Sequence, residues 1–506
     1  MYISTRDNYQ SVSAAKAIKL GMVPTGGLFV PENIPSLSQK DILAILQGSY
    51  SDVAKKILGL YLDDYLVEEI SECVDKAYVD NFNHEDIVAL HQLTDSVYVM
   101  ELWHGPTAAF KDMALQVMPH LLSLALQKLE FDKEIVILVA TSGDTGKAAL
   151  EGFKDIPGIK IVCFYPYGGV SKIQERQMTT TDGKNTYVVG VKGNFDDCQN
   201  AVKAIFGDEE YCSFLAKNGY ELSSANSINW GRLLPQIVYY VFSYLKLVKD
   251  KKISLGDKVN FVVPTGNFGN ILAGWYAGKM GLPINKLICA SNENKVLTDF
   301  FHTGVYEKNR AFKHTKSPSM DILVSSNLER FLYEMTGRDG KTISSWMEDL
   351  NNKGYFEIGD KLKEAIAEVL WADFATEDET MAMIKQEFNK TEYLMDTHTA
   401  VGMKVYEKYL KETGDDTVTI LDSTASPFKF TASVLEALAG FQAVNNKDEF
   451  ELFQELSKIV DMPVHSALKD LKEKPVLHDR VCEKGDIKKE LEDIIGNFLL
   501  INSSYT

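Results

Sequence analysis

Three stretches of this sequence share one pattern: a short apolar run, a loop of small polar residues, and then a helical repeat. The runs are Ile135–Ala140, Val259–Pro264 and Val418–Leu421. They are apolar throughout instead of alternating, which is typical of strands buried on both faces of a parallel sheet. Ligands of such sheets bind beyond the carboxyl ends of the strands. The pattern therefore predicts an α/β fold with open, mostly parallel sheets, in which three loops face one site.

The chain has 506 residues, and this length predicts about two or three domains. We expect an N-terminal unit over residues 1–92, a core with the strand–helix alternation over 93–440 and a helical covering segment over 441–506. Within the core, residues 300–395 replace the strand–helix alternation with helical patterns, for example at Leu362–Trp371. We interpret residues 300–395 as a helical insertion.

The net charge of −18 makes nucleic acid and anionic membrane poor partners, because an acidic surface repels phosphate. The six cysteines contain no CxxC pair, so no zinc site is expected and no metal is predicted. Scattered cysteines indicate buried thiols in a reducing compartment. The first ten residues lack an apolar signal segment, and no run of eighteen apolar residues occurs. We therefore expect a cytoplasmic protein.

The loop Thr265–Asn270 (TGNFGN) favours the binding of an anion. A strand that runs into a Gly-rich turn and a helix start leaves backbone N–H groups free to donate. The helix dipole adds about 0.3–1 kcal/mol to each such contact. The loop pattern by itself leaves two interpretations open, a phosphate site and a tight turn without a ligand.

The loop Thr141–Lys147 (TSGDTGK) is excluded as a nucleotide P-loop, which needs Gly where Thr141 stands and Ser or Thr where Ala148 stands. A turn lined by hydroxyl and amide groups at a helix start suits a small carboxylate instead. In the third loop, Ser423 and Thr424 either offer a neutral hydroxyl to a ligand or cap the next helix.

Lys111 opens a helical pattern in the apolar segment Glu101–Pro119 (ELWHGPTAAFKDMALQVMP). Most lysines at a helix start are solvated charges. Here the apolar setting and the helix dipole both disfavour the ammonium form, and so lower the lysine pKa. A drop of about three pH units, or about 4 kcal/mol, would make the amine mostly neutral near neutral pH. Schiff-base chemistry needs that neutral amine.

The order of these motifs resembles that of the fold-type II pyridoxal-phosphate enzymes: a lysine after a Gly-Pro-Thr turn, then TSGDTG, then a Gly/Asn loop, then a late Ser/Thr. Within that group the chain resembles the threonine synthase family, in its longer enteric and fungal form. The motifs that carry the resemblance are GMVPTGGLFVP, HGPTAAFKD, SSANSINWGRLLPQ, PTGNFGNILAG and STASPFKF. Together they extend from about residue 4 to residue 440.

The resemblance implies a role for each matched position. Lys111 would carry pyridoxal 5′-phosphate as a Schiff base, Asp144 would lie beside the cofactor 3′-oxygen, and Thr424, or Ser423 beside it, would bond the pyridine nitrogen. The backbone amides expected to hold the cofactor phosphate are those of Gly266, Asn267, Phe268, Gly269 and Asn270. The residues expected at the substrate carboxylate are Thr141, Ser142, Gly143, Asp144 and Thr145. Those expected on the substrate phosphate side are Asn226, Asn229 and Arg232.

Two positions depart from the family pattern. The last motif commonly reads STAHPAKF, whereas Ser426 and Phe428 stand here in place of its His and its second Ala. The pocket wall near the pyridine ring is therefore expected to differ from that of other members. The lysine, the Gly/Asn loop and Thr424 are intact.

The function that the resemblance implies is conversion of O-phospho-L-homoserine and water to L-threonine and phosphate, by a monomer or a homodimer. One alternative is another fold-type II lyase acting on a phospho- or hydroxy-amino acid, such as one that releases 2-oxobutyrate from the same substrate. Another is a non-catalytic protein that binds the cofactor. Product analysis separates the first alternative, and substitution of Lys111 separates the second.

Overall fold

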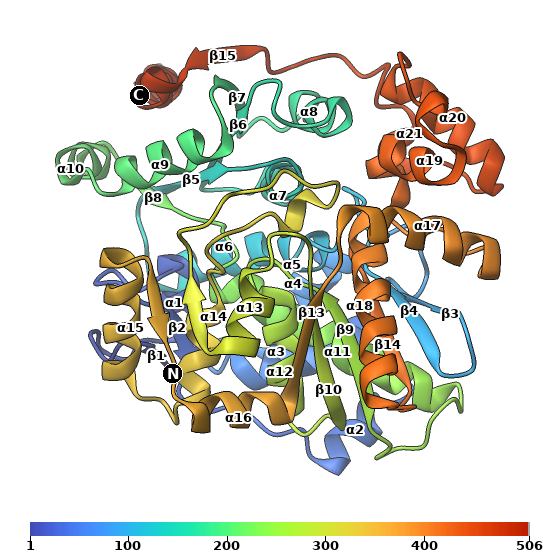
Figure 1. Ribbon diagram of the computed structural model, residues 1–506. Coiled ribbons are helices and arrows are strands. Elements are labelled where there is room, and N and C mark those ends of the chain that lie inside the picture. Colours follow the sequence, from blue (N-terminus) through green and yellow to red (C-terminus); the bar gives the residue numbers. More distant parts are fainter. Residues whose placement is uncertain (504–506) are drawn as a thin grey trace.

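Two sheets form the centre of the protein and lie one above the other in Figure 1. The computed structural model describes residues 1–503, with side chains through residue 496. The smaller sheet occupies the upper part of the view and the larger sheet the lower part. The predicted fold class, α/β with two open and mostly parallel sheets, is confirmed.

The larger sheet is parallel except for one antiparallel edge strand. Its strands, in spatial order, are β13 (Leu370–Phe374), β10 (Ile284–Ser291), β9 (Val259–Pro264), β14 (Thr419–Ser423), β4 (Val97–Glu101) and β3 (Ala89–Gln92). Every residue of β9 and β14 is buried, as expected of central strands covered on both faces. The helices that follow these strands or cover the sheet include α11 (Trp230–Lys249), α12 (Gly269–Lys279) and α18 (Thr397–Thr413).

The smaller sheet is parallel throughout. Its strands, in spatial order, are β15 (Arg480–Glu483), β7 (Thr186–Lys192), β6 (Ile159–Pro166), β5 (Glu134–Ala140) and β8 (Tyr220–Ser223). Its helices are α7 (Asp144–Phe153), α8 (Lys172–Thr179), α9 (Phe195–Phe206) and α10 (Glu209–Lys217). The three predicted runs therefore form β5 in this sheet and β9 and β14 in the larger one.

The N-terminal residues share one hydrophobic core with the helices of the larger sheet. This region contains β1 (Tyr2–Ser4), α1 (Ala14–Leu20), β2 (Phe29–Pro31), α2 (Gln39–Ile45), α3 (Tyr50–Tyr61) and α4 (Val67–Tyr78). The ring of Tyr50 lies 5.3 Å from that of Phe242 in α11, and the ring of Tyr2 lies 5.5 Å from that of Trp230. Two further helices, α5 (Asp112–Leu115) and α6 (Met118–Lys128), connect β4 to β5. The predicted boundary at residue 92 stays a prediction.

Residues 300–395 contain helices, as expected, but also a strand of the larger sheet. The elements are α13 (Val296–Thr303), β11 (Val305–Glu307), η1 (Pro318–Met320), α14 (Leu328–Met335), α15 (Gly340–Asn352), β12 (Tyr355–Glu357), α16 (Asp360–Val369), β13 and α17 (Glu377–Thr391). The helix expected over Leu362–Trp371 ends at Val369, and β13 begins at the next residue. The apolar residues at the end of that pattern belong to the larger sheet, because β13 pairs with β10.

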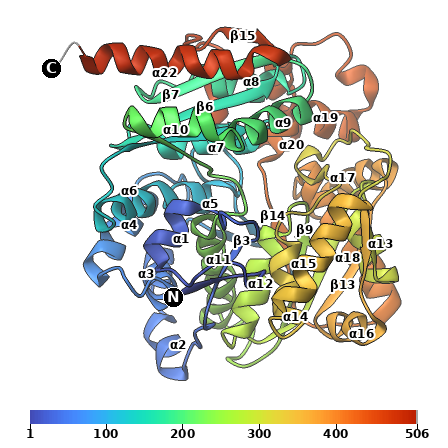
Figure 2. The same ribbon diagram turned by 90° about the vertical axis from the view of Figure 1, so that its left-hand side faces the viewer.

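The last part of the chain follows β14 and ends across the smaller sheet, along the top of Figure 2. It contains η2 (Pro427–Phe430), α19 (Thr431–Ala439), η3 (Phe441–Ala443), α20 (Glu449–Val460), α21 (Ser466–Lys469), β15, η4 (Lys484–Asp486) and α22 (Ile487–Ser503). The segment predicted to be helical thus also supplies edge strand β15. Residues 504–506 of that prediction lie outside the described residues.

Three features of the described residues bear on the predicted environment. Their helices are all too short or too polar to cross a membrane. No group of three or more His, Cys, Asp or Glu side chains among them is arranged to hold a metal ion. The six cysteines are free thiols, and five of them are buried.

Candidate active site

Lys111 lies where the turn after β4 meets the turn after β14. The backbone N–H of Phe110 donates to the carbonyl of Thr424 at 2.8 Å. Ala109 and Ala425 form an antiparallel bridge, and the N–H of Ser426 donates to the carbonyl of Ala108 at 3.0 Å. The lysine and the late Ser/Thr motif, far apart in sequence, are therefore fixed against each other through the backbone.

The Lys111 side chain is buried, with 10% of its area exposed. Its Nζ donates to Ser319 Oγ at 3.3 Å and lies 3.8 Å from Asp144 Oδ2. Burial lowers the Lys111 pKa to about 8; Asp144 opposes the shift, and the cations Lys429 and Arg232 add to it. The direction is the one expected from the apolar sequence around the lysine. With this pKa about a tenth of the amine is neutral at pH 7.

Asp144 begins α7 and is held as an anion. Its Oδ1 accepts from Lys429 Nζ at 2.8 Å and from Gln174 Nε2 at 3.0 Å. Burial opposes ionisation, but the ammonium groups of Lys429 and Lys111 lower the Asp144 pKa well below its ordinary value. The carboxylate therefore supplies the site with a fixed negative charge between two lysines.

The turn that carries Asp144 closes on the hydroxyl of Thr141, whose Oγ1 accepts from the N–H groups of Gly143 (3.0 Å) and Gly146 (2.9 Å). Gly143 has φ +133°, and a Cβ there would lie 2.4 Å from the Gln174 amide. Glycine is therefore required at that position. Of the other predicted residues, Ser142 is exposed and Thr145 is half-buried.

The second turn, Thr265–Asn270, presents the start of α12 without a side-chain cap. Phe268 at this start has φ 61°, the left-handed region, and Asn267 is exposed. A Cβ on Gly266 would lie 2.7 Å from the carbonyl oxygen of Ser319, so the turn packs directly against the segment that contacts Lys111. Uncapped N–H groups at a helix start, close to a buried lysine, fit the phosphate of pyridoxal phosphate.

The Asn270 side chain faces inward instead of toward a ligand. Its Oδ1 accepts from Tyr239 (2.5 Å) and Tyr240 (2.7 Å), and its Nδ2 donates to Asp422 Oδ2 at 3.0 Å. Tyr240 also donates to that Asp422 oxygen at 3.1 Å. Asn270 therefore anchors the turn to strand β14, and its backbone N–H is the group left for an anion.

The structure separates the two hydroxyls proposed for the pyridine nitrogen. Ser423 Oγ already accepts from Trp103 Nε1 at 3.1 Å and from Thr399 Oγ1 at 3.0 Å. The Thr424 side chain is buried, and among the described residues nothing is hydrogen-bonded to its hydroxyl. Thr424 is thus the better placed of the two, and Ser423 belongs to the surrounding core.

The two departures from the family motif lie in different surroundings. Ser426 Oγ is buried and has no hydrogen-bond partner among the described residues. Phe428 packs in the core, with its ring 6.3 Å from that of Phe453 in α20. Its bulk therefore holds the C-terminal helices against the site.

Arg232 is a buried cation near Lys111, on the first turn of α11. Its Nη1 donates to the Ala225 carbonyl at 2.9 Å, and its Nε has no partner. Burial lowers the Arg232 pKa to about 10, and no carboxylate among the described residues forms an ion pair with it. Asn229 is committed to structure, since it caps α11 and donates to the Ile18 carbonyl at 3.0 Å. Asn226 is half-buried nearby in sequence.

Sequence reasoning missed two contributors, Ser319 and Lys429. Ser319, in η1, contacts both Lys111 and Asp144, and its N–H donates to His398 Nε2 at 3.1 Å. Lys429 was visible within the STASPFKF motif, and its position after β14 is the signal that could have found it. Ser319 lies in the region interpreted as an insertion, where no motif marks it.

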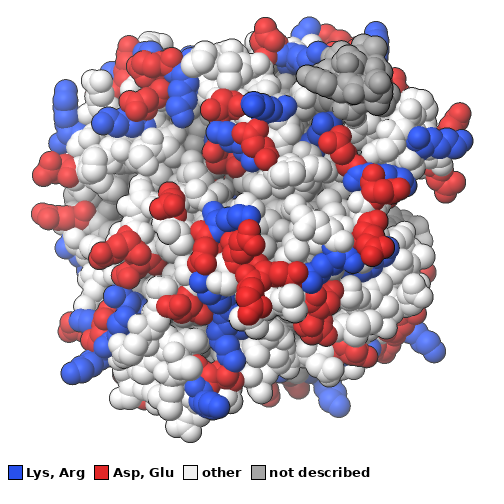
Figure 3. All heavy atoms as spheres, turned by 180° about the vertical axis from the view of Figure 1, so that it is seen from behind, with Lys and Arg blue, Asp and Glu red and all other residues white. Residues whose placement is uncertain are grey.

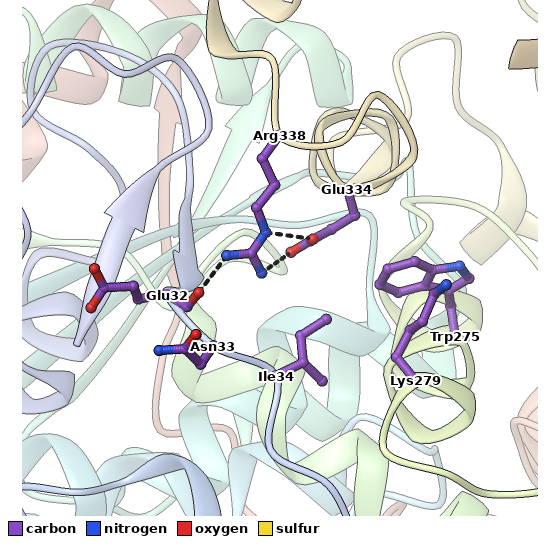
Figure 4. Close-up of a pocket in the computed structure, with 7 residues that line it drawn as sticks. All are labelled: Glu32, Asn33, Ile34, Trp275, Lys279, Glu334 and Arg338. Atoms are coloured by element: carbon purple, nitrogen blue, oxygen red, sulfur yellow. Dashed lines mark hydrogen bonds and ion pairs between the residues drawn. The ribbon is translucent and has the colours of Figure 1, made fainter.

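A separate hollow of about 360 Å³ lies between the end of β2 and helices α12 and α14 (Figure 4). Its Arg338 is already paired with Glu334 at 2.9 Å and donates to the Glu32 carbonyl at 2.5 Å. The charge of that guanidinium is already paired with a carboxylate, unlike that of Arg232, so this hollow offers less to an anion than the site around Lys111.

Fold, buried lysine and uncapped helix start together define a pyridoxal-phosphate enzyme. The family model "Pyridoxal-phosphate dependent enzyme" matches residues 85–423. The models "Threonine synthase N terminus" and "Threonine synthase, C-terminal" match residues 1–78 and 399–478. The chain belongs to the threonine synthase family. By family it is a lyase with the activity of a threonine synthase and with pyridoxal phosphate as its cofactor.

Relatives and solved structures agree with this assignment. Threonine synthase-like 1 of Homo sapiens is 39% identical over 98% of this chain and 69% of its own length. Threonine synthase of Schizosaccharomyces pombe is 38% identical over 88% of this chain and 90% of its own. The pyridoxal-phosphate-bound threonine synthase from Brucella melitensis superposes with a TM-score of 0.86, at 35% identity, covering 98% of both chains. The yeast enzyme superposes equally well, at 34% identity, covering 98% of this chain and 99% of the other.

Proposed function

We propose that Lys111 holds the cofactor and is the catalytic base in the conversion of O-phospho-L-homoserine and water to L-threonine and phosphate. The observation that carries this proposal is the position of the Lys111 amine. It is buried, its pKa is lowered to about 8, and Ser319 connects it to Asp144 and to the turn at Gly266. A base with a pKa near the working pH combines a useful neutral fraction with useful basicity.

The cofactor, when bound, supplies the electron sink that makes the substrate α-proton acidic. Around it, the turn Gly266–Asn270 would hold the phosphate through backbone N–H groups. The Thr424 hydroxyl would bond the pyridine nitrogen, and Asp144 would lie beside the 3′-oxygen. A neutral hydroxyl at the ring nitrogen does not force that nitrogen to carry a proton, which keeps the sink weaker than a carboxylate partner would.

Two parts of the site match the two anionic ends of the substrate, its carboxylate and its phosphate. The turn Thr141–Thr145 would bind the carboxylate with N–H and hydroxyl groups at the start of α7. Arg232, with Asn226 near it in sequence, would bind the phosphate, because a buried guanidinium without a carboxylate is a costly arrangement until an anion joins it. Lys111 Nζ would remove the α-proton between these two anchors and return a proton there at the end of the reaction.

The decisive experiment compares the wild type with Lys111→Ala in a mixture of holoenzyme and O-phosphohomoserine. Phosphate, threonine and 2-oxobutyrate are assayed together. We expect equal amounts of threonine and phosphate from the wild type, and a loss of at least about 10³-fold in the variant. Lys408→Ala serves as the control, because this partly exposed lysine is bonded to Glu379 in the outer helices. Threonine formation retained by the Lys111 variant would refute the assignment, and 2-oxobutyrate as the main product would favour the phospho-lyase alternative.

The cellular setting is part of the same proposal. Six free thiols favour a reducing compartment, and we propose the cytoplasm. On the face shown in Figure 3, acidic and basic side chains are interspersed, without the broad basic area that nucleic acid requires. We propose that the protein acts on its small-molecule substrate as a monomer or homodimer. Size-exclusion chromatography with light scattering, run with and without added nucleic acid, tests both points.

A further inference from the structure

Lys429 brings together three segments of the active site. It lies in η2, directly after β14, and its side chain is fully buried. Its Nζ donates to the carbonyl of Thr107 at 2.9 Å and pairs with Asp144 Oδ1 at 2.8 Å. Thr107 belongs to the turn before Lys111, whereas Asp144 follows β5 of the smaller sheet. One ammonium group therefore joins the two sheets at the point where the proposed base lies.

The two oxygens of Asp144 are used unequally. Oδ1 makes two close contacts, with Lys429 and with Gln174 at 3.0 Å. Oδ2 accepts from Ser319 Oγ at 3.3 Å and lies 3.8 Å from Lys111 Nζ, beyond hydrogen-bond reach. The nearest carboxylate to Lys111 is thus already engaged by another lysine.

We propose that Lys429 is a positioning residue: it holds the Asp144 carboxylate in its own ion pair, so that the Lys111 amine is left without a close counterion. A base must spend part of its time neutral, and a close carboxylate would hold Lys111 as the ammonium ion. This proposal rests on the role of Lys111 given above, and it assigns to Lys429 the task of keeping that amine available.

The charges around Lys111 support this role. Burial has the largest effect and lowers the Lys111 pKa. The carboxylates Asp144 and Asp112 raise it, whereas the cations Lys429 and Arg232 lower it. Loss of the Lys429 charge would act twice in the same direction: a repelling cation would disappear, and the Asp144 carboxylate would be free to move onto Lys111. Both changes raise the Lys111 pKa. If Lys429 merely ties the two sheets together, its removal would lower stability and leave the titration of Lys111 in place.

The test measures the protonation of Lys111 in two ways, in wild type and in Lys429→Met. In the holoenzyme, the acid limb of the pH profile of kcat reports the base. In the full-length protein after dialysis to remove the cofactor, trace acetylation with acetic anhydride gives the midpoint for each lysine by mass spectrometry. We expect Lys429→Met to raise both midpoints by at least about one pH unit, a loss of about tenfold in neutral amine below pH 8.

Two matched variants keep the result interpretable. Lys19→Met removes another buried lysine that pairs with a carboxylate, Glu221, and should leave both midpoints where they are. Lys429→Met combined with Asp144→Asn leaves neither charge of the pair buried alone, and its labelling midpoint should lie at or below that of the wild type. An unchanged or lowered midpoint in Lys429→Met, or a raised one in the double variant, overturns the proposal. The labelling needs no turnover, so it stands even if the assigned reaction proves wrong.

Discussion

Asp144 and Asp422 are both buried aspartates beside a Gly-rich turn at the active site, and the protein shifts their pKa values in opposite directions. Lys429 and Lys111 lower the Asp144 pKa well below its ordinary value, against the effect of burial. Burial raises the Asp422 pKa well above its ordinary value, and its hydrogen bonds from Tyr240 and Asn270 offset this only in part. The difference lies in the neighbours: Asp144 has cations and Asp422 has neutral donors.

The contrast shows how one turn architecture serves two purposes. The turn at Asp144 contributes a charged side chain, so it can balance the lysines of the site. The turn at Asn270 turns its side chain inward toward Asp422 and leaves backbone N–H groups for an anion. A carboxylate ionised beside that second turn would repel a phosphate, and the upward shift of the Asp422 pKa acts against that repulsion.

The largest effect should come from removing the charge at Asp144. Asp144→Asn leaves Lys429 buried without its carboxylate, and breaking a buried pair in this way costs about 3–5 kcal/mol. We expect a clear fall in Tm and a loss of about 10²-fold in kcat/KM. Thermal melting at neutral pH and steady-state kinetics measure both. Asp422→Asn is the matched control and should melt no lower than the wild type at neutral pH; equal losses in the two variants would contradict the comparison.

The next prediction distinguishes the turn at Gly266, which is proposed to bind the cofactor, from the turn at Gly143, which is proposed to bind the substrate. A Cβ on Gly143 would strike the Gln174 amide, whereas a Cβ on Gly266 would strike the backbone of Ser319. We expect Gly266→Ala to weaken cofactor binding by about tenfold or more, because Ser319 must move and the phosphate turn moves with it. Gly143→Ala should raise KM by a similar factor while the cofactor stays bound.

Cofactor affinity is measured by fluorescence titration of the cofactor-free variants, and KM by the phosphate assay. Gly440→Ala provides a control, because it too has a positive φ, at 86°, but nothing lies within 4 Å of its added Cβ. Two variants with the same pattern of losses would mean that the turns do not divide cofactor from substrate.

The turns themselves could be predicted from the sequence, because each is local: an apolar strand, small residues, a helix start. The local pattern made Lys111 a candidate, and the order of the motifs, which carries the family resemblance, selected it. The pKa shifts could not be predicted, since they depend on contacts between distant segments, such as Ser319 with Lys111 across 208 positions. The choice between Ser423 and Thr424 also needed the structure, because only the observed contacts of Trp103 show that the Ser423 hydroxyl is already used.

The strand β13 escaped prediction for a different reason. Leu370 and Trp371 continue the helical spacing of α16, and a short apolar run at the end of a helix pattern does not distinguish the two structures. Pairing with β10 decides the matter in the fold. Ser319 lies in the same stretch, so the interpretation of residues 300–395 as an insertion concealed a group that contacts the proposed base.

The smallest effect is a pH dependence with opposite sign at the two aspartates. The pKa of Asp144 is lower in the folded protein than in the unfolded chain. Its contribution to stability is therefore present above the ordinary pKa of about 3.9 and is lost as the pH falls below that value. The pKa of Asp422 is higher in the folded protein than in the unfolded chain. Its contribution is therefore largest at low pH and decreases as the pH rises above about 3.9 toward the folded pKa.

Melting of the wild type, Asp144→Asn and Asp422→Asn at several pH values between about 2.5 and 8 tests this directly. We expect the Tm deficit of Asp144→Asn to stay nearly constant above about pH 4.5 and to shrink only below about pH 3.9. Asp422→Asn should melt close to the wild type at pH 4 and become relatively more stable as the pH rises, by at most about 1.4 kcal/mol for each pH unit. A difference between Asp422→Asn and the wild type that does not vary with pH would mean that Asp422 is ionised in the folded protein. The neutral surroundings of the second turn would then need another explanation.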